Sequence, residues 1–254
     1  MQAQDILEGA EEFAFGHGST GALLVHGFTG SPRSMIDLGR YLAERDISVK
    51  GIRLPGHGTT WQDLNTRTTT DWTGAVSDAI DGFEADHEEV FLVSLSFGSA
   101  LCLDFAARHP GRVKGLVLLA PFVKTNDPLR FVAPVASKVI KSVPGVGNDI
   151  CLEGQDEICY DRVPAAASVH MLRFVRRVRN NLDKVTTPTL IMHARQDHTS
   201  PPVNAQLIHD GISSRDKELV WLERSYHVIT MDHERDEVYR RTHEFIQKRS
   251  KGAV

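Results

Sequence analysis

The sequence predicts an α/β protein with a mostly parallel sheet that helices cover on both faces. Two patterns support this prediction. Short runs in which nearly every residue is apolar alternate with segments whose apolar residues recur every three or four positions. Continuous apolar runs are typical of strands buried on both faces, which is the usual state of a parallel sheet. The chain has 254 residues and is therefore long enough to enclose a sizeable core.

The first half of the chain contains most of the predicted elements. Strands are expected at 12–15, 21–26, 47–52, 90–95 and 114–120. A helix is expected after Ser31 and Pro32, which suit the cap and the first turn, with Leu38 and Leu42 on its buried side. Further helices are expected at 71–86 and 99–108, so that strands and helices alternate.

The alternation breaks at Pro121. The next clear strand, at 189–193, begins more than sixty residues later, after a stretch with four prolines and helical patterns near 129–141 and 165–182. A connection this long inside a compact domain usually has a function. We therefore expect a core domain at 1–121 and 186–254 and a small cap insertion at 122–185, over the carboxyl ends of the strands, where such sheets bind ligands. The remaining predicted elements are a helix at 203–210, a strand at 217–222 and a helix at 234–248.

A serine lies at an abrupt strand-to-helix turn. The apolar run from Val90 leads into Ser94-Leu-Ser96-Phe-Gly98, and a helical segment follows at once. Strand, sharp turn and helix around a serine form the nucleophile elbow of an α/β-hydrolase, usually spelled G-x-S-x-G. Ser94 stands where the first glycine is expected and still meets the need for a small side chain. It is the weaker candidate nucleophile because no glycine follows two residues on, so Ser96 is predicted to attack the acyl carbon.

Asp197 and His227 complete a predicted catalytic triad. A serine hydroxyl is a poor nucleophile near neutral pH, so it needs a base, and the base needs an orienting acid. In this fold the order along the chain is serine, acid and histidine, each on a loop after a strand. Asp197 follows the strand at 189–193, and His227 follows the strand at 217–222. Asp127 is an alternative acid, although Asn126-Asp127-Pro128 also reads as an ordinary turn.

Two backbone N–H groups are predicted to form the oxyanion hole. One belongs to Phe97, directly after the nucleophile, and the other to Phe28 in His26-Gly27-Phe28, which follows the strand at 21–26. Losing one such donor typically costs about 2.7–4 kcal/mol of transition-state stabilisation. The alternative is that His26-Gly27-Phe28 is only a strand-ending turn.

Composition and motifs argue against other classes of site. The formal net charge is −4 and no block of like charges occurs, so nucleic acid is not an expected partner. Gly16-x-Gly18-x-x-Gly21 matches the dinucleotide-binding pattern in letters, but it precedes a strand instead of following one, so we read it as a loop and expect no cofactor. No H-E-x-x-H or similar spacing occurs, so no metal is expected, and His57, His193 and His198 are read as structural or solvated.

The sequence also carries signals of compartment. The first residues have no basic region followed by an apolar core, so we expect no signal peptide. No apolar run approaches the roughly 20 residues needed to span a bilayer. The three cysteines, Cys102, Cys151 and Cys159, contain no C-x-x-C pair and read as reduced thiols. These observations predict a cytoplasmic protein, and they leave its oligomeric state open.

The chain resembles the bacterial monoacylglycerol lipases and the related small carboxylesterases over nearly its whole length. The likeness is carried by His26-Gly-Phe-Thr-Gly30, Gly56-His-Gly58, the Ser96 elbow, Asp197 and Ser225-Tyr-His-Val228. Glu157-Ile-Cys-Tyr160-Asp-Arg-Val-Pro164 is similar to the family's stretch that places a glutamate against the glycerol head group, which implicates Glu157 in substrate binding. Ser94 and Ala194 depart from glycines of the family without removing a catalytic atom. The resemblance implies a small-molecule ester substrate with a medium or long acyl chain, similar to a monoacylglycerol.

Several alternatives remain open at this stage. Phe28, Phe97, Phe122 and Phe131 are candidates to line an acyl pocket, and Phe97 and Phe122 can equally be plain core. A thioesterase or a C–C bond hydrolase would use the same triad, and a non-catalytic ligand receptor can share the fold. The segment 171–179 combines an apolar stripe with four arginines, so transient contact of the cap with a lipid surface is weighed against a solvated helix face.

Overall fold

The computed structural model describes residues 5–126, 133–145 and 147–250. Its centre is a seven-stranded sheet in the order β1-β3-β2-β4-β5-β8-β9, in which β1 is antiparallel and the other neighbours are parallel. The strands are β1 Phe13–Phe15, β2 Thr20–Val25, β3 Ile47–Ile52, β4 Glu89–Leu95, β5 Gly115–Leu119, β8 Thr189–Ala194 and β9 Lys217–Leu222. The predicted mostly parallel sheet is therefore confirmed.

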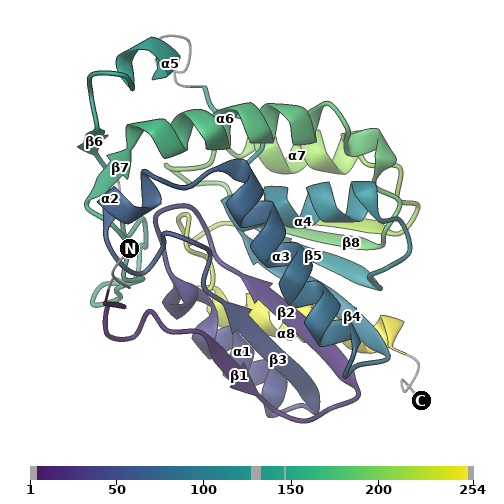
Figure 1. Cartoon of the computed structure of the whole chain (residues 1–254). Coiled ribbons are helices and arrows are strands. Elements are labelled where there is room, and N and C mark those ends of the chain that lie inside the picture. The colour runs from purple at the N-terminus through teal and green to yellow at the C-terminus, as the bar shows by residue number, and fades with distance from the viewer. Residues whose placement is uncertain (1–4, 127–132, 146, 251–254) are drawn as a thin grey trace.

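Helices cover both faces of this sheet (Figure 1). The helices α1 (Ile36–Ala43), which continues the short helix η1 (Pro32–Met35), and α8 (Arg235–Arg249) lie on one face. The other face carries α3 (Thr69–Glu84), α4 (Phe97–Arg108) and α7 (Val203–Gly211). One short helix, α2 (Trp61–Leu64), was not expected from the sequence.

The alternation of side chains along each strand builds two cores. In β2, Leu23 and Val25 pack with α3 and α4, whereas Ala22 and Leu24 pack with α1 and α8. All four side chains are fully or almost fully buried. Burial on both faces is the physical reason why these strands are apolar at every position.

The start of α3 is fixed by a capping box. The carboxylate of Asp71 accepts hydrogen bonds from the backbone N–H of Thr68 at 2.7 Å and from its hydroxyl at 2.8 Å. This capping contact satisfies the backbone N–H of Thr68 at the start of the helix. It lets α3 begin at Thr69, two residues before the predicted start.

The segment between β5 and β8 differs from its prediction. Of the helix predicted at 129–141, the described part forms only α5 (Ala133–Ala136), and Asp127, Phe131 and the rest of 127–132 lie outside the described residues. A two-stranded antiparallel pair follows, β6 (Ser142–Pro144) with β7 (Arg162–Pro164). The second predicted helix, α6 (Ala165–Arg179), ends three residues early, and the short helix η3 (Leu182–Lys184) comes after it.

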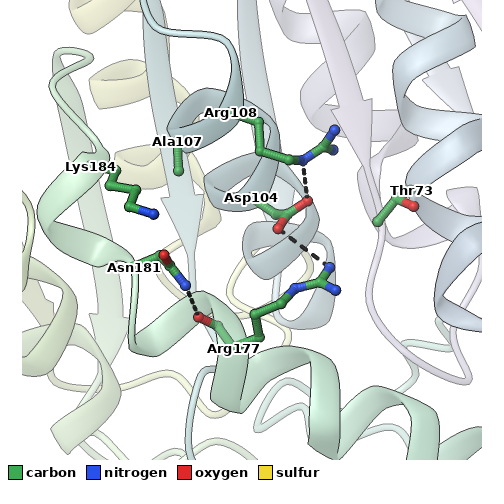
Figure 2. Close-up of a pocket in the computed structure, with 7 residues that line it drawn as sticks. All are labelled: Thr73, Asp104, Ala107, Arg108, Arg177, Asn181 and Lys184. Atoms are coloured by element: carbon green, nitrogen blue, oxygen red, sulfur yellow. Dashed lines mark hydrogen bonds and ion pairs between the residues drawn. The ribbon is translucent and has the colours of Figure 1, made fainter.

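Helix α6 packs on α3 and α4 (Figure 1). Its buried side chains Phe174, Val175 and Val178 belong to the same core as α3 and α4. Figure 2 shows an ionic link across this contact, in which Asp104 of α4 lies 2.8 Å from Arg108 and 3.5 Å from Arg177 of α6. This link stands in a polar hollow, away from Ser96, that is lined by Thr73, Asp104, Ala107, Arg108, Arg177, Asn181 and Lys184. Within the described part of the chain, no helix is long and apolar enough to cross a membrane.

Candidate active site

Ser96 stands at the turn between β4 and α4 in a strained backbone conformation. Its φ is 53° and its ψ is −117°, a region that residues with a side chain rarely adopt. The conformation is held on both sides: the Ser96 N–H donates to the carbonyl of Leu119 at 2.9 Å, and its own carbonyl accepts the N–H of Ser99 at 3.1 Å. Strain that the surroundings enforce is characteristic of functional turns, and this geometry is the nucleophile elbow.

Two glycines let the backbone approach this serine closely. A β-carbon on Gly98 would lie 2.5 Å from the carbonyl oxygen of Val25, so only glycine allows α4 to pack this near β2. A β-carbon on Gly27 would lie 3.1 Å from the β-carbon of Ser96. The loop after β2 therefore runs directly beside the elbow.

Ser94 is a buried structural residue. Its side chain is fully buried, and its hydroxyl donates toward the carbonyl of Val117 at 3.3 Å and lies 3.2 Å from the hydroxyl of Ser99. A serine can stand here in place of the usual glycine because these partners satisfy the hydrogen bonds of its hydroxyl inside the core.

Asp197 and His227 meet although 30 residues separate them. Nδ1 of His227 lies 2.8 Å from Oδ2 of Asp197, and both residues are buried. The other oxygen, Oδ1, accepts the backbone N–H groups of Thr199 at 2.9 Å and Ser200 at 2.7 Å. The carboxylate is thereby fixed in the plane that receives the imidazole.

The surroundings shift the pKa values of Asp197 and His227 in opposite directions. Burial tends to raise the pKa of Asp197, but the charge of His227 and hydrogen bonds from His193 and His227 outweigh it and lower that pKa. Burial tends to lower the pKa of His227, but the charge and hydrogen bond of Asp197 outweigh it and raise that pKa. The arrangement therefore stabilises an imidazolium next to a carboxylate, which is the state a general base reaches when it takes a proton.

Ser96 is not hydrogen-bonded to His227 among the described residues. It is 8% exposed, and its hydroxyl has no acceptor within the described part of the chain. Catalytic hydrogen bonds are often long before substrate binds, so this geometry does not rule out a Ser96–His227 pair.

Phe28 and Phe97 lie side by side next to the elbow. Their rings meet edge to face with centroids 5.7 Å apart. Phe97 is the first residue of α4, so its backbone N–H has no partner inside the helix. The loop that carries Phe28 is held by His26, whose Nδ1 lies 2.8 Å from the Gly27 carbonyl and whose Nε2 accepts the N–H of Leu54 at 3.1 Å. Burial, joined by the charge of Arg53, lowers the pKa of His26 to about 4, so the ring is neutral and its tautomer is fixed.

Glu157 comes from the insertion and reaches the same region. Its Oε2 would lie 3.3 Å from a β-carbon placed on Gly30, in the loop after β2. Its backbone N–H and Oε1 form two hydrogen bonds with Asn148, at 2.9 and 3.1 Å. Desolvation raises the pKa of Glu157, while the charge of His227 acts against it. The carboxylate is therefore close enough to His227 for their charges to interact.

Two aspartates, the half-buried Asp149 and the buried Asp232, connect the insertion to the loops that carry Asp197 and His227. Asp149 accepts the N–H of His198 at 3.1 Å and the hydroxyl of Thr199 at 3.1 Å, and it pairs with Nδ1 of His198 at 2.9 Å. Asp232 accepts four backbone N–H groups at 2.8–2.9 Å, which belong to Cys151, Leu152, Tyr226 and His233. Sequence reasoning did not find either aspartate, because both lie in loops with no informative spacing.

Cys151, Asp232 and His233 bring one potential metal ligand each within 4.8 Å of one another. The two oxygens of Asp232 are already used by the four backbone N–H groups just described. This set is therefore better explained as a loop anchor than as a metal centre. Of the other histidines, His57 is buried beside Phe28 with ring centroids 5.8 Å apart, and His193 contacts Asp197.

The chain is similar to known hydrolases over almost its whole length. A family described as serine aminopeptidase, S33, matches residues 20–234. A thermostable monoacylglycerol lipase of Bacillus sp. (strain H-257) is 34% identical over 96% of both chains, and a carboxylesterase of Bacillus subtilis (strain 168) is 30% identical over 93% of this chain and 96% of that protein. A solved structure from work on LipS and LipT, two metagenome-derived lipolytic enzymes, is 35% identical, has a TM-score of 0.93, and covers 96% of this chain and 100% of its own.

These likenesses agree with the fold and with the site. They span almost the whole of each protein. This chain has the layered α/β sheet and a serine at a strand-turn-helix junction, as the sequence predicts. The chain therefore belongs to the serine aminopeptidase, S33, family of α/β-hydrolases and is a serine carboxylic ester hydrolase.

Proposed function

We propose that Ser96, His227 and Asp197 are the catalytic triad of an ester hydrolase that works through an acyl-enzyme. Ser96 attacks the ester carbonyl while His227 takes its proton, and the backbone N–H groups of Phe28 and Phe97 bind the oxyanion. His227 then returns the proton to the leaving alcohol. In the second half, His227 takes a proton from water, the water attacks the acyl-enzyme, and the proton passes to Ser96 as the acid leaves. Asp197 holds His227 in the required tautomer throughout.

The observation that carries this proposal is the backbone of Ser96. A φ of 53° at a serine between a buried strand and a helix is costly, and the fold pays for it with two backbone hydrogen bonds and two close-packed glycines. Ser94, the competing serine, has an ordinary strand position and a satisfied hydroxyl.

The first test is the Ser96→Ala variant assayed with a p-nitrophenyl ester. Turnover should fall by at least three orders of magnitude while circular dichroism shows an unchanged fold. Unchanged turnover would exclude Ser96 as the nucleophile. An aminoacyl anilide assayed in parallel measures the peptidase activity that the family description names, and we expect it to be hydrolysed far more slowly than the ester.

We propose a monoacylglycerol-like ester as the substrate class. The curated relatives include a monoacylglycerol lipase, the Glu157 carboxylate lies beside Gly30 in the loop after β2, and its charge interacts with that of His227, which supports a place for Glu157 beside the leaving alcohol. A carboxylate there can accept hydrogen bonds from the hydroxyls of a glycerol group, which simple esters lack.

This substrate assignment is tested with monoacylglycerols and methyl esters of matched acyl chains. Glu157→Gln should raise KM for the glycerol esters and leave KM for the methyl esters nearly unchanged. Glu153→Gln, an exposed change in the same insertion, serves as the matched control. Equal effects on both ester series would show that Glu157 does not bind the alcohol. Faster turnover of acyl thioesters, or of C–C bonded diketones, would favour the other chemistries open to this triad.

The insertion at 122–185 is proposed to act as the cap of this site and to touch lipid surfaces transiently. The stripe of α6 is not the contact surface, because Phe174, Val175 and Val178 face the core. Exposed apolar side chains lie instead around α5 and β6, namely Val135, Val139, Ile140 and Val143. Val139 is 83% exposed and Val135 is 72% exposed, which is unusual for valine unless the surface meets an apolar partner.

Flotation with phosphatidylcholine vesicles tests this contact. The double variant Val135→Ser/Val139→Ser should bind vesicles several-fold less, whereas Val203→Ser, an exposed valine on α7, should bind like the wild type. Equal binding of all three proteins would refute the proposed surface. The cytoplasmic location remains a prediction of the sequence.

A further inference from the structure

A second histidine, His193, contacts the carboxylate of Asp197. His193, on β8, is fully buried, and its Nε2 lies 3.1 Å from Oδ2 of Asp197 and 3.0 Å from the carbonyl oxygen of Ser200. Oδ2 is the same oxygen that receives Nδ1 of His227. Oδ2 therefore contacts two imidazoles, that of His227 and that of the buried His193 on β8.

The surroundings of His193 fix its tautomer. Nε2 faces two oxygen acceptors and no donor, so it must carry the proton. Nδ1 is buried and has no hydrogen-bond partner among the described residues. An unpaired lone pair costs less than an unpaired N–H donor in such a place, so the proton lies on Nε2 and not on Nδ1. Its ring also packs against Trp221 with centroids 6.2 Å apart, which holds its orientation.

We propose that His193 is a positioning residue that tunes the triad, because its Nε2–H bonds to the Ser200 carbonyl and holds Nε2 3.1 Å from Oδ2 of Asp197. The inference rests on the proposed triad and deepens it. By sharing Oδ2, His193 keeps the carboxylate in the orientation that His227 requires. It also takes up part of the negative charge of Asp197, so it moderates how strongly that carboxylate holds the imidazolium form of His227. The sequence alone predicts a structural or solvated His193. The contacts in the fold add the positioning role proposed here.

Other charged groups near His227 also influence its pKa. Glu157 and Asp149, both from the insertion, act on His227 in the same direction as Asp197 and raise its pKa. His193 approaches from β8 and places its Nε2 against the same carboxylate oxygen. A change at His193 should therefore alter the Asp197–His227 pair while the two insertion carboxylates stay as they are.

The test compares His193→Leu with His193→Gln. Leucine removes the donor, so Asp197 should hold the imidazolium more tightly, and the acid limb of the kcat/KM profile should move to higher pH by about one unit. We also expect kcat to fall about tenfold with KM little changed, because the Asp197 carboxylate loses a contact that keeps it in the orientation His227 requires. Glutamine can place an N–H close to the position of Nε2 and should restore most of kcat and the wild-type acid limb.

Thr189→Val is the matched control for a change in the core. Thr189 is also fully buried on β8, and its hydroxyl donates to the Thr187 carbonyl at 2.8 Å without touching the triad. It should lower the melting temperature and leave the acid limb in place. If His193→Leu does not fold, the His193→Gln profile and ¹⁵N NMR of the wild type still decide the matter, since the NMR spectrum should show the His193 proton on Nε2.

Two sets of results would overturn the proposal. One is a folded His193→Leu enzyme with the wild-type kcat and acid limb, and the other is a His193 proton on Nδ1. Asp197→Asn distinguishes this failure from failure of the triad itself. If Asp197→Asn abolishes turnover while His193→Leu changes nothing, only the role of His193 is wrong. If Asp197→Asn is fully active, the triad is wrong as well.

Discussion

The buried carboxylate of Asp232 accepts the backbone N–H of Tyr226 at 2.8 Å, one residue before His227. The same carboxylate accepts the N–H groups of Cys151 and Leu152 in the insertion. One side chain thus anchors the loop of the proposed base to the segment that leads to Glu157.

Asp232→Asn should therefore destabilise the protein. The amide would place an NH₂ group against backbone donors and leave buried N–H groups without an acceptor, at a cost of about 2–4 kcal/mol. Urea unfolding followed by fluorescence measures the loss. Asp78→Asn changes an exposed aspartate of α3 and should unfold like the wild type. Equal stability of the two variants would show that Asp232 is not an anchor.

The pH dependence of turnover follows from His227. Only the neutral imidazole can accept the serine proton, so activity is lost as His227 becomes protonated. Because the pKa of His227 is raised above its ordinary 6.5, the acid limb of kcat/KM should lie above pH 6.5. The charge of Glu157 contributes to that rise, so Glu157→Gln should move the limb to lower pH when a methyl ester is the substrate. An acid limb that stays in place would mean that Glu157 does not act on His227.

Stability should fall in mild acid because of His26. Its pKa in the folded protein is lowered to about 4, while the unfolded chain has the ordinary 6.5, so the unfolded state binds the proton first. The contribution of His26 is complete above pH 6.5 and is lost as the pH falls toward 4, by about 3 kcal/mol in total. Urea unfolding at several pH values should show a smaller loss for His26→Gln and the wild-type loss for His17→Gln, which changes an exposed histidine.

Ser94→Ala separates the two serines of the elbow. It removes a buried hydroxyl that contacts Val117 and Ser99, so it should cost about 1 kcal/mol of stability. Turnover per folded molecule should stay within a factor of about two, because the hydroxyl faces the core and takes no part in the proposed reaction. A loss comparable to that of Ser96→Ala would reverse the assignment of the nucleophile.

The sheet could be predicted from the sequence because its information is local. Strands β3 and β9 were predicted with their observed bounds, since apolar runs bounded by turn residues are unambiguous when they alternate with helical patterns. The positions of Ser96, Asp197 and His227 followed from strand ends and chain order, and the structure places Asp197 against His227.

The insertion could not be predicted in the same way. Strands β6 and β7 have three residues each, contain Pro144 and Pro164, and pair across an interval that carries no signal of its own. The contacts of Asp149 and Asp232 depend on loops that meet only after folding, so no spacing in the sequence marks them. Side chains of this kind decide how the triad is held, and only a three-dimensional structure reveals them.

The central claim is that Ser96 is the nucleophile, and covalent labelling tests it most directly. A fluorophosphonate reacts with an activated serine and gives a stable adduct, and fragmentation of the labelled peptide distinguishes Ser94, Ser96 and Ser99. We predict one label for each molecule, carried by Ser96, with loss of ester hydrolysis in proportion to labelling. A label on another serine, or full turnover by the labelled protein, would contradict the account.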